Sequence, residues 1–278
     1  MTLTPEQIEA RRRYLGASDS PAIIGVDPYR SPVDVYLSKV NALDDVASPK
    51  AEAGSRLEPV LLDYAAEYLG RPILDRGTMH VKGLLACNLD GRFSETELVE
   101  CKTTGLVDGW GDDESDEIPD KVLVQVHHQF YVTGAAVCWV PVILARFGLS
   151  FRMFRVQRNE QLCEIVASKG VEFMEQHVAR RKPPTGIPSL EILKRIRREP
   201  GKWVDVPDEL VAAWSEAREA EKAADKGREE AQAALLAALG DAEGGRCSAG
   251  DLTYLEQERT GYTVAASRYR TLRLKARK

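Results

Sequence analysis

Three charged residues near the middle of the chain, Asp90, Glu100 and Lys102, have types and spacing that could carry out chemistry. Side chains of a β-strand alternate between its two faces, so Glu100 and Lys102 point to the same side. Asp90 and Gly91 form a pair typical of a tight turn, which predicts a hairpin at this point, after a strand that ends at Leu89. The hairpin would return Glu100 to the neighbourhood of Asp90.

Two carboxylates that meet at one point suit Mg²⁺, a hard cation that prefers oxygen ligands and keeps several of its waters. A bound ion of this kind polarises a phosphoryl oxygen and lowers the pKa of a bound water, and Lys102 could orient that water or offset negative charge. The chemistry indicated is hydrolysis of a phosphodiester. The alternative is a hairpin with a solvated Glu and Lys face, because such charged triplets are common.

A helix is predicted upstream over residues 54–70, where Gly70 closes the pattern. Glu58 lies on the same stripe as Leu61, Leu62 and Ala65, so its carboxylate would lean toward packed surface, where an acid needs a cation. The alternative is that Ser55 and Glu58 form a capping box at the start of this helix, with Pro59 in its first turn.

A second helix is predicted downstream over residues 119–133, ended by Gly134. Gln125, His128 and Gln129 form a polar stripe on it, at i, i+3 and i+4. Gln125 could hold an attacking water or a phosphate, and the alternative is a solvated helix face. His127 and His128 are interpreted as surface or packing residues, because neither a matching His spacing nor a cysteine pair accompanies them.

The N-terminal part joins a basic cluster, Arg11, Arg12 and Arg13, to a glycine-containing turn and a helix start at Ser18 to Pro21. Backbone N–H groups at a helix start, a serine hydroxyl and an arginine together suit a phosphate. The alternative is a simple helix cap with a solvated arginine cluster.

Taken together, these stretches resemble the YqaJ-type viral recombinase family, phage recombination exonucleases related to lambda exonuclease within the PD-(D/E)XK nuclease superfamily. The resemblance covers roughly residues 8–184. It includes a "PY-x-SP" turn within 23–32 and Trp110-Gly111 ahead of the glutamine helix. The spacings that carry it are Arg-x6-Ser-Asp from Arg11, Gly-x3-Glu from Gly54 to Glu58, Asp-x9-Glu-x-Lys from Asp90 to Lys102, and then Gln125.

The resemblance implies a role for each matching residue. Asp90 and Glu100 would bind Mg²⁺, for which Mn²⁺ would substitute, with help from the backbone carbonyl of Cys101, and Lys102 would activate the water. The remaining roles are metal or outer-shell ligand for Glu58, positioning of nucleophile and lysine for Gln125, and a grip on the 5′-phosphate for Ser18 with Arg11, Arg12 or Arg13, of which the spacing favours Arg11.

The fold implied is an α/β restriction-endonuclease-like core, a short mixed sheet flanked by helices. The function implied is a Mg²⁺-dependent 5′-to-3′ exonuclease on linear double-stranded DNA that leaves 3′ single-stranded ends for strand annealing in phage-type recombination. An annealing protein is the implied partner, and a trimeric ring is expected by analogy alone. The alternatives are a restriction-like endonuclease on the same core and a DNA-binding or scaffold protein without catalysis.

Composition sets limits on these expectations. The chain has 278 residues, of which 44% are hydrophobic, enough for a nuclease domain and a smaller addition. No long apolar run or signal segment is present, so we expect a cytoplasmic protein of a phage or prophage in its bacterial host. Five scattered cysteines contain no close pair, so neither disulfides nor an iron–sulfur cluster is expected. The net charge of −5 is unusual for a DNA-binding protein, but basic segments are local.

Two parts of the chain are predicted, a nuclease core over residues 1–184 and an accessory region over 185–278. Residues 208–239 are rich in Ala, Glu, Lys and Arg and predict one long, largely solvated helix that ends at Gly240. A small β hairpin is expected around residues 252–255 and 260–261, followed by a basic tail. This region could clamp DNA or join subunits, and the alternative is a solvated scaffold.

Overall fold

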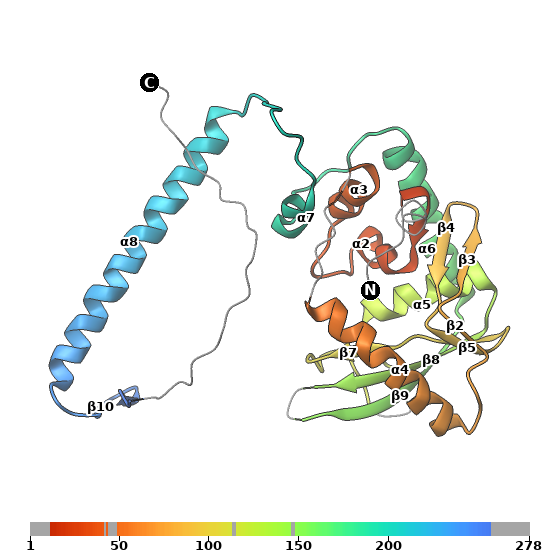
Figure 1. Cartoon of the computed structure of the whole chain (residues 1–278), viewed down its shortest axis with the longest axis horizontal. Coiled ribbons are helices and arrows are strands. Elements are labelled where there is room, and N and C mark those ends of the chain that lie inside the picture. Colours follow the sequence, from red (N-terminus) through yellow and green to blue (C-terminus); the bar gives the residue numbers. More distant parts are fainter. Residues whose placement is uncertain (1–11, 42, 44–48, 113–114, 146–147, 257–278) are drawn as a thin grey trace. The chain divides into compact units, whose positions relative to one another are not determined.

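The computed structural model describes residues 12–41, 43, 49–112, 115–145 and 148–256, and the side chains of 49 and 50 are outside this description. The chain divides into two units, Met1–Pro200 and Gly201–Lys278. The first unit holds the mixed sheet and nearly all of the buried apolar residues. Its α/β architecture confirms the predicted fold class (Figure 1).

A six-stranded mixed sheet forms the centre of the first unit. Its longest strand, β8, pairs with β9 along one edge in antiparallel fashion and with β6 and β7 along the other edge in parallel fashion. Antiparallel pairs of β6 with β5 and of β5 with β2 complete it. The strands are β2 (Asp75–Arg76), β5 (Gly91–Ser94), β6 (Glu97–Val99), β7 (Lys102–Thr104), β8 (Val137–Leu144) and β9 (Ser150–Gln157).

β6 and β7 are two parts of one strand, interrupted at Glu100 and Cys101. Both run along β8, and the amide of Glu100 donates to the carbonyl of Trp139 at 3.0 Å, which keeps the line of the strand through the interruption. Leu98 packs in the core on one face of the sheet and Val99 in the core on the other. The alternation predicted for this segment is therefore confirmed.

The hairpin predicted at Asp90-Gly91 is wrong. The β5–β6 hairpin turns at Glu95 and Thr96, whereas Asp90 and Gly91 lead from β4 (Leu85–Asn88) into β5. β4 belongs to a separate three-stranded sheet with β1 (Leu15–Gly16) and β3 (Met79–Lys82). Gly91 is needed for close approach, because a Cβ there would come within 2.9 Å of a Leu62 methyl group.

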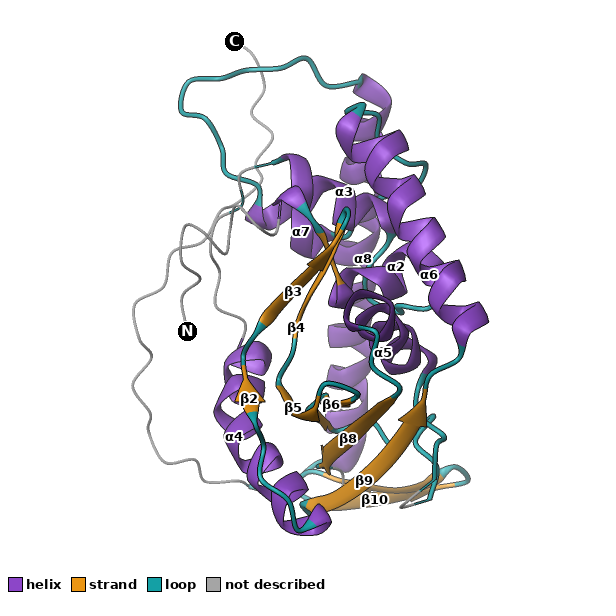
Figure 2. Ribbon diagram, turned by 90° about the vertical axis from the view of Figure 1, so that its right-hand side faces the viewer, coloured by secondary structure: helices purple, strands orange, loops and turns teal. Residues whose placement is uncertain are grey.

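Helices cover both faces of the six-stranded sheet (Figure 2). The helix α5 (Asp120–Thr133) ends at Gly134, which has φ +81°, as its sequence predicted. Together with α6 (Glu160–Phe173), α5 packs on the face that carries Leu98 and Val140. On the opposite face, α4 (Pro49–Leu69) buries Leu62 and Ala65 against Val99.

The capping box proposed as an alternative for Ser55 and Glu58 is wrong, because α4 begins six residues before Ser55, at Pro49. Pro59 therefore lies inside the helix, where it leaves the carbonyl of Ser55 without its helical donor. Ser55 is exposed, so water can meet that carbonyl. Glu58 is then free to serve something other than the helix start.

Short helices surround the first strand of the three-stranded sheet. A 3₁₀ turn, η1 (Ala17–Asp19), leads into α2 (Ser20–Ile24), which has a proline in its first turn as predicted. The backbone amide of Ser189, which caps α7, donates to Asp34 at 2.7 Å, so the segment after residue 184 packs on the first unit. The remaining helices are α3 (Pro32–Val40), the π-helix η2 (Met174–Ala179) that continues α6, and α7 (Leu190–Arg195).

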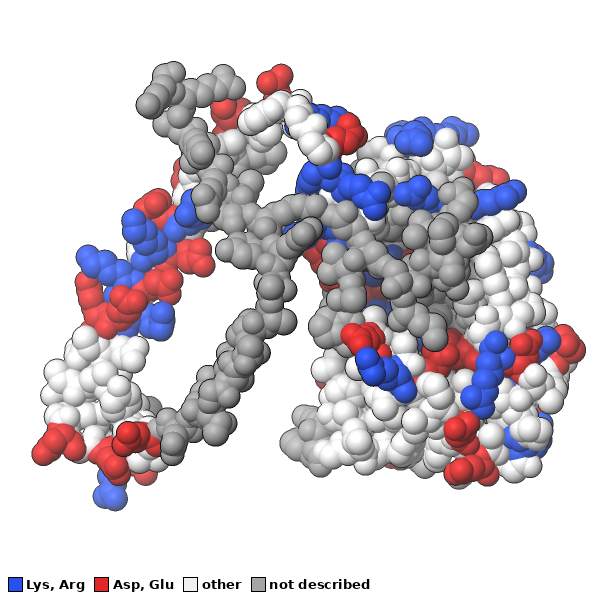
Figure 3. All heavy atoms as spheres, viewed as in Figure 1, with Lys and Arg blue, Asp and Glu red and all other residues white. Residues whose placement is uncertain are grey.

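The second unit consists of α8 (Asp208–Leu239) and a hairpin of β10 (Gly244–Cys247) and β11 (Gly250–Thr253). The bounds of α8 match the prediction and none of its residues is buried. Acidic and basic side chains alternate along its middle, while its last turns carry neither (Figure 3). The hairpin turns earlier than predicted, and residues 260–261 and the basic tail lie outside the described residues. Within the described part of the chain, no helix has both the length and the apolar character that a membrane span requires.

Candidate active site

Glu100 is the centre of a buried polar cluster at the interruption between β6 and β7. Its carboxyl group is only 3% exposed and accepts hydrogen bonds on both oxygens. Oε1 accepts from the ammonium of Lys102 and from Nε2 of Gln125 at 2.6 Å, and Oε2 accepts from Nε2 of Gln129 at 2.5 Å. A buried carboxylate is thus held by three donors from two elements.

Lys102 remains a cation in this cluster. Burial alone would lower the pKa of its ammonium group, but the negative charges of Glu100 and Asp90 outweigh burial and raise it. The ammonium also donates to Oε1 of Gln125 at 3.1 Å. Lys102 is therefore a fixed positive charge that two side chains orient.

Asp90 joins the cluster from the connection between the two sheets. Its Oδ2 accepts from the backbone amide of Cys101 at 2.7 Å, while its Oδ1 accepts no hydrogen bond from the described residues. Burial, and then the negative charge of Glu100, raise the pKa of Asp90 well above its usual range. The expected meeting of Asp90 and Glu100 is thus present, although a different turn produces it.

Glu58 faces the same cluster from α4. It is half-buried, and burial followed by the negative charge of Glu100 raises its pKa. The Sγ of Cys101 lies 3.9 Å from the carbonyl oxygen of Glu58, which places the helix directly beside the strand interruption. Three carboxyl groups therefore share one small volume with one ammonium group.

The residues present fit a hard divalent cation. Asp90 and Glu58 each have a pKa raised in part by a like-charged neighbour, an excess of negative charge that a cation would relieve. No set of three or more His, Cys, Asp or Glu side chains forms a ready cage in the described part of the chain. Mg²⁺ does not need one, because it binds through one or two carboxylates and keeps its waters. Asp90, Glu100 and the carbonyl of Cys101 would hold it.

His128 fixes the helix that carries the glutamines. Its Nε2 donates to the carbonyl of Ala86 in β4 at 3.1 Å, and its Nδ1 accepts from the hydroxyl of Ser20 at 2.6 Å. Burial lowers the pKa of His128 to about 4, so the ring is neutral. His127 is buried as well and donates to Leu123 on its own helix. The interpretation of both histidines as packing residues is confirmed.

Ser18 is exposed at the 3₁₀ turn, as a phosphate grip would require. The guanidinium beside it belongs to Arg30, which donates to the Ser18 carbonyl at 3.4 Å and to Asp19 at 2.8 Å. Asp19 also binds the buried ammonium of Lys39 at 2.7 Å. Although burial acts to raise the pKa of Asp19, Lys39 and Arg30 outweigh it and hold that pKa well below its usual range.

The arginines favoured from the sequence lie elsewhere or outside the described residues. Arg11 is outside them. Arg12 donates to the carbonyl of Asn41 at 3.5 Å, and the Arg13 guanidinium stacks 5.5 Å from the centre of the Tyr14 ring. Sequence spacing favoured Arg11 and missed Arg30, because only the folded turn after α2 brings Arg30 back to Ser18.

Gln129 is the second residue that sequence reasoning left out of the site. A signal was present, because Gln129 follows Gln125 by one helical turn and is flanked by the apolar residues Val126 and Phe130. A buried amide on an apolar helix face needs a polar partner. Glu100 is that partner, but its position across from α5 is set by the sheet.

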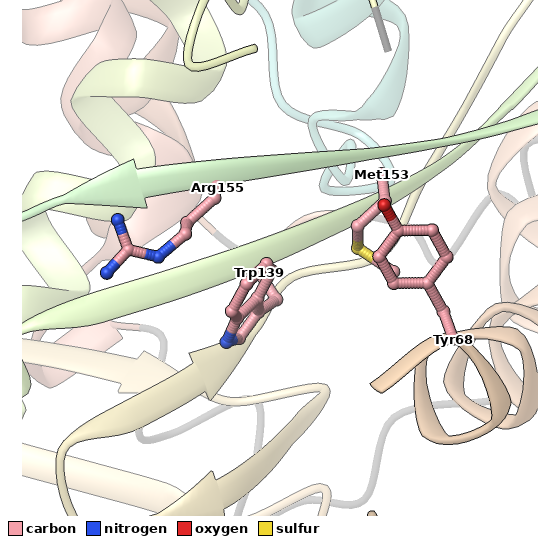
Figure 4. A pocket seen from close by; sticks show the side chains of 4 residues that line it. All are labelled: Tyr68, Trp139, Met153 and Arg155. Carbon is pink, nitrogen blue, oxygen red and sulfur yellow. The ribbon is translucent and has the colours of Figure 1, made fainter. Parts of the chain in front are cut away.

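A separate cavity of about 250 Å³ opens near the α4 side of the sheet. It is lined by Tyr68, Trp139, Met153 and Arg155, and Figure 4 shows the Trp139 ring between Arg155 on one side and Tyr68 with Met153 on the other. None of the clustered carboxyl groups lines it. The candidate site is therefore the carboxylate cluster and not this cavity.

The comparisons with known proteins agree with this geometry. The sequence model of the YqaJ-like viral recombinase domain matches residues 7–136. This segment is a YqaJ-like viral recombinase domain. The match covers Glu58, Asp90, Glu100, Lys102 and Gln125, and it confirms the resemblance inferred from their spacing.

A curated relative and two solved structures extend the match. The uncharacterized YqaJ protein of Bacillus subtilis strain 168 is 25% identical over 188 residues, which are 64% of this chain and 58% of that protein, so the match spans less than two thirds of the relative. The LHK-Exo structure with dAMP superposes with a TM-score of 0.52 at 16% identity, over 64% of this chain and 94% of that one. The alkaline exonuclease LHK-Exo from Laribacter hongkongensis, at a TM-score of 0.50, 16% identity and the same coverage, shows the same fold.

Proposed function

We propose that this chain is a Mg²⁺-dependent nuclease that acts on DNA. The observation that carries the proposal is the convergence of Asp90, Glu100 and Glu58 on one cationic lysine, within a domain of the viral recombinase family. When bound, the metal ion would polarise the phosphate and lower the pKa of a water.

The chain's own residues supply the remaining chemistry. Lys102, held cationic between Glu100 and Gln125, would orient the water and offset the negative charge that develops on the phosphate. Gln125 donates to Glu100 and accepts from Lys102, so it fixes the distance between the carboxylate and the ammonium group. The cluster is therefore preorganised before any substrate arrives.

The finer proposal is digestion from a 5′ end of linear double-stranded DNA. Ala17 packs in the same core cluster as Leu89 and Val122, so Ser18 lies beside the segment that leads into Asp90. An exposed hydroxyl with the partly exposed guanidinium of Arg30 suits a terminal phosphate. The similar LHK-Exo structure contains dAMP, a nucleoside monophosphate, which is consistent with a phosphate site in this fold.

Removal of one strand from its 5′ end would leave a 3′ single strand. Such a product suits a single-strand annealing protein, and a closed ring of subunits would keep the enzyme on its DNA. Both belong to this proposal by family resemblance. The charge of −5 makes local basic groups, Arg30 among them, responsible for holding phosphates.

The test is release of nucleotides from linear duplex DNA in Mg²⁺, with and without a chelator. We expect Glu100→Ala and Lys102→Ala to lose at least about 100-fold in rate, because each removes a group that acts on the reacting phosphate. DNA binding should persist in both variants. Glu52→Ala, at an exposed position of α4, is the matched control and should cleave normally. Unaltered rates in Glu100→Ala would refute the site.

End recognition is tested separately. Ser18→Ala and Arg30→Met should each narrow the preference for 5′-phosphorylated over 5′-hydroxyl DNA, since each removes a donor to the terminal phosphate. Closed circular duplex DNA should resist degradation. Cleavage of that circle would instead assign an endonuclease to the same cluster.

A further inference from the structure

We infer that Gln129 is a positioning residue that determines which oxygen of Glu100 binds the metal ion. The inference rests on the proposed metal site and adds a residue and an atom to it. Its basis is the unequal occupation of the two Glu100 oxygens by hydrogen-bond donors.

A carboxylate oxygen has two lone pairs directed at partners. Oε1 of Glu100 accepts from both Lys102 and Gln125, so its lone pairs are used. Oε2 accepts from Gln129 alone among the described residues, which leaves one lone pair open. Glu100 can therefore offer a single lone pair to a cation, and that lone pair is on Oε2.

The amide of Gln129 can face Glu100 in one orientation only. A carboxylate accepts and does not donate, so Nε2 of Gln129 must point toward it. Oε1 of Gln129 is then buried without a partner among the described residues, and the whole side chain is 1% exposed. A buried acceptor without a partner costs stability, and it is retained here beside Val126 and Phe130, where an apolar side chain would pack. The contact with Glu100 is what that cost maintains.

The helix around Gln129 is immobilised, so its amide is a fixed reference for the carboxylate. The neighbouring His128 is bonded to β4 and to Ser20, and Gln125, one turn earlier, holds the other oxygen. Two amides on one helix thus fix the plane of the Glu100 carboxyl group. Without Gln129, the carboxyl group can rotate about its terminal bond and turn Oε2 away from the side of Asp90.

Gln129 separates from Gln125 in what it touches. Gln125 bonds to Lys102 as well as to Glu100, so its loss disturbs the ammonium group and the carboxylate together. Side-chain contact from Gln129 goes to Glu100 alone. Loss of Gln129 should therefore weaken metal binding while the lysine stays in place.

The experiment measures direct binding of Mn²⁺ and Mg²⁺ to the full chain without DNA, by electron paramagnetic resonance and by calorimetry. Gln129→Met removes the donor at similar volume, and Gln129→Asn keeps an amide that is too short to reach Glu100. We expect the dissociation constant to rise about tenfold or more in both, the usual effect of losing a group that orients a metal ligand. Gln161→Met, at an exposed position of α6, should change it less than twofold.

Two further readouts make the outcomes decisive. Thermal melting in a chelator reports whether each variant is folded, and if one is not, the other decides. At saturating metal the cleavage rate should stay within about fivefold of wild type, because Lys102 and Gln125 are intact. Unchanged metal affinity in a folded Gln129 variant, or a fall in rate at saturating metal without a fall in affinity, overturns the inference. Absence of binding in the wild-type chain would instead overturn the proposed function.

Discussion

Asp19 joins three parts of the N-terminal segment, and replacing it with Asn tests how that segment is held. The Asp19 side chain, 13% exposed, bonds to the Lys39 ammonium at 2.7 Å and to the Arg30 guanidinium at 2.8 Å. Lys39 is the more deeply placed partner, with 3% of its side chain exposed, and it also donates to the carbonyl of Tyr14. Asp19→Asn keeps the shape and removes the charge.

The size of the effect follows from which cation is left without a partner. Removal of one member of a buried ion pair costs about 3 to 5 kcal/mol, because the other charge remains buried and uncompensated. The Arg30 side chain is 34% exposed and can return to water, whereas Lys39 cannot. With the Tyr14 carbonyl still in place, we expect the lower end, a loss of about 3 kcal/mol in the free energy of unfolding.

Chemical denaturation of both proteins between pH 2 and 8 measures this loss. The folded-state pKa of Asp19 lies below its unfolded value, so its contribution is complete above about pH 4 and declines as the pH falls further. Glu52→Gln, which breaks an exposed pair with Arg56, is the control and should cost less than about 1 kcal/mol. A difference below about 1 kcal/mol for Asp19→Asn at pH 7, equal to the surface pair, would refute the argument.

Three further outcomes are expected. Gly91→Ala should lower the free energy of unfolding by about 1 to 3 kcal/mol, because its Cβ would meet Leu62 at 2.9 Å, whereas Gly54→Ala, in open space on α4, should stabilise the chain slightly; denaturation midpoints distinguish the two. His128→Gln should flatten the pH dependence of stability: the neutral His128, with a pKa of about 4, binds fewer protons than the unfolded chain, so wild type should lose about 3 kcal/mol relative to the variant between pH 7 and 4, and parallel curves would contradict this. Mg²⁺ should raise the melting temperature of wild type but not of Asp90→Asn, and an equal rise in both would place the ion elsewhere.

Local patterns in the sequence were sufficient for the parts of the fold that depend on local interactions. The bounds of α8 and the end of α5 at Gly134 follow from composition and from the left-handed conformation of a terminal glycine. The alternation of side chains through Glu100 and Lys102 was also predictable, since a strand keeps its period of two even across an interruption held by the bond from Glu100 to Trp139.

Contacts between distant segments were beyond reach. Asp90-Gly91 has the composition of a hairpin turn, but it connects two sheets because Gly91 must fit against Leu62 on α4. The partnership of Arg30 with Ser18 depends on a turn whose path is set by packing. The early start of α4 was missed because Pro59 suggested a first helical turn, and sequence alone does not show that water can replace its missing donor.

The β5–β6 hairpin sets where the chain can be lengthened without harm. Asp90 and Glu100 flank the open end of its two arms, while Glu95 and Thr96 form the far tip. One extra residue within an arm would invert the facing of everything after it and send the Glu100 carboxyl group to the side of α4. An epitope tag or fluorescent label spliced between Glu95 and Thr96 leaves both arms in register, so this tip is a permissive attachment point for following the protein on DNA.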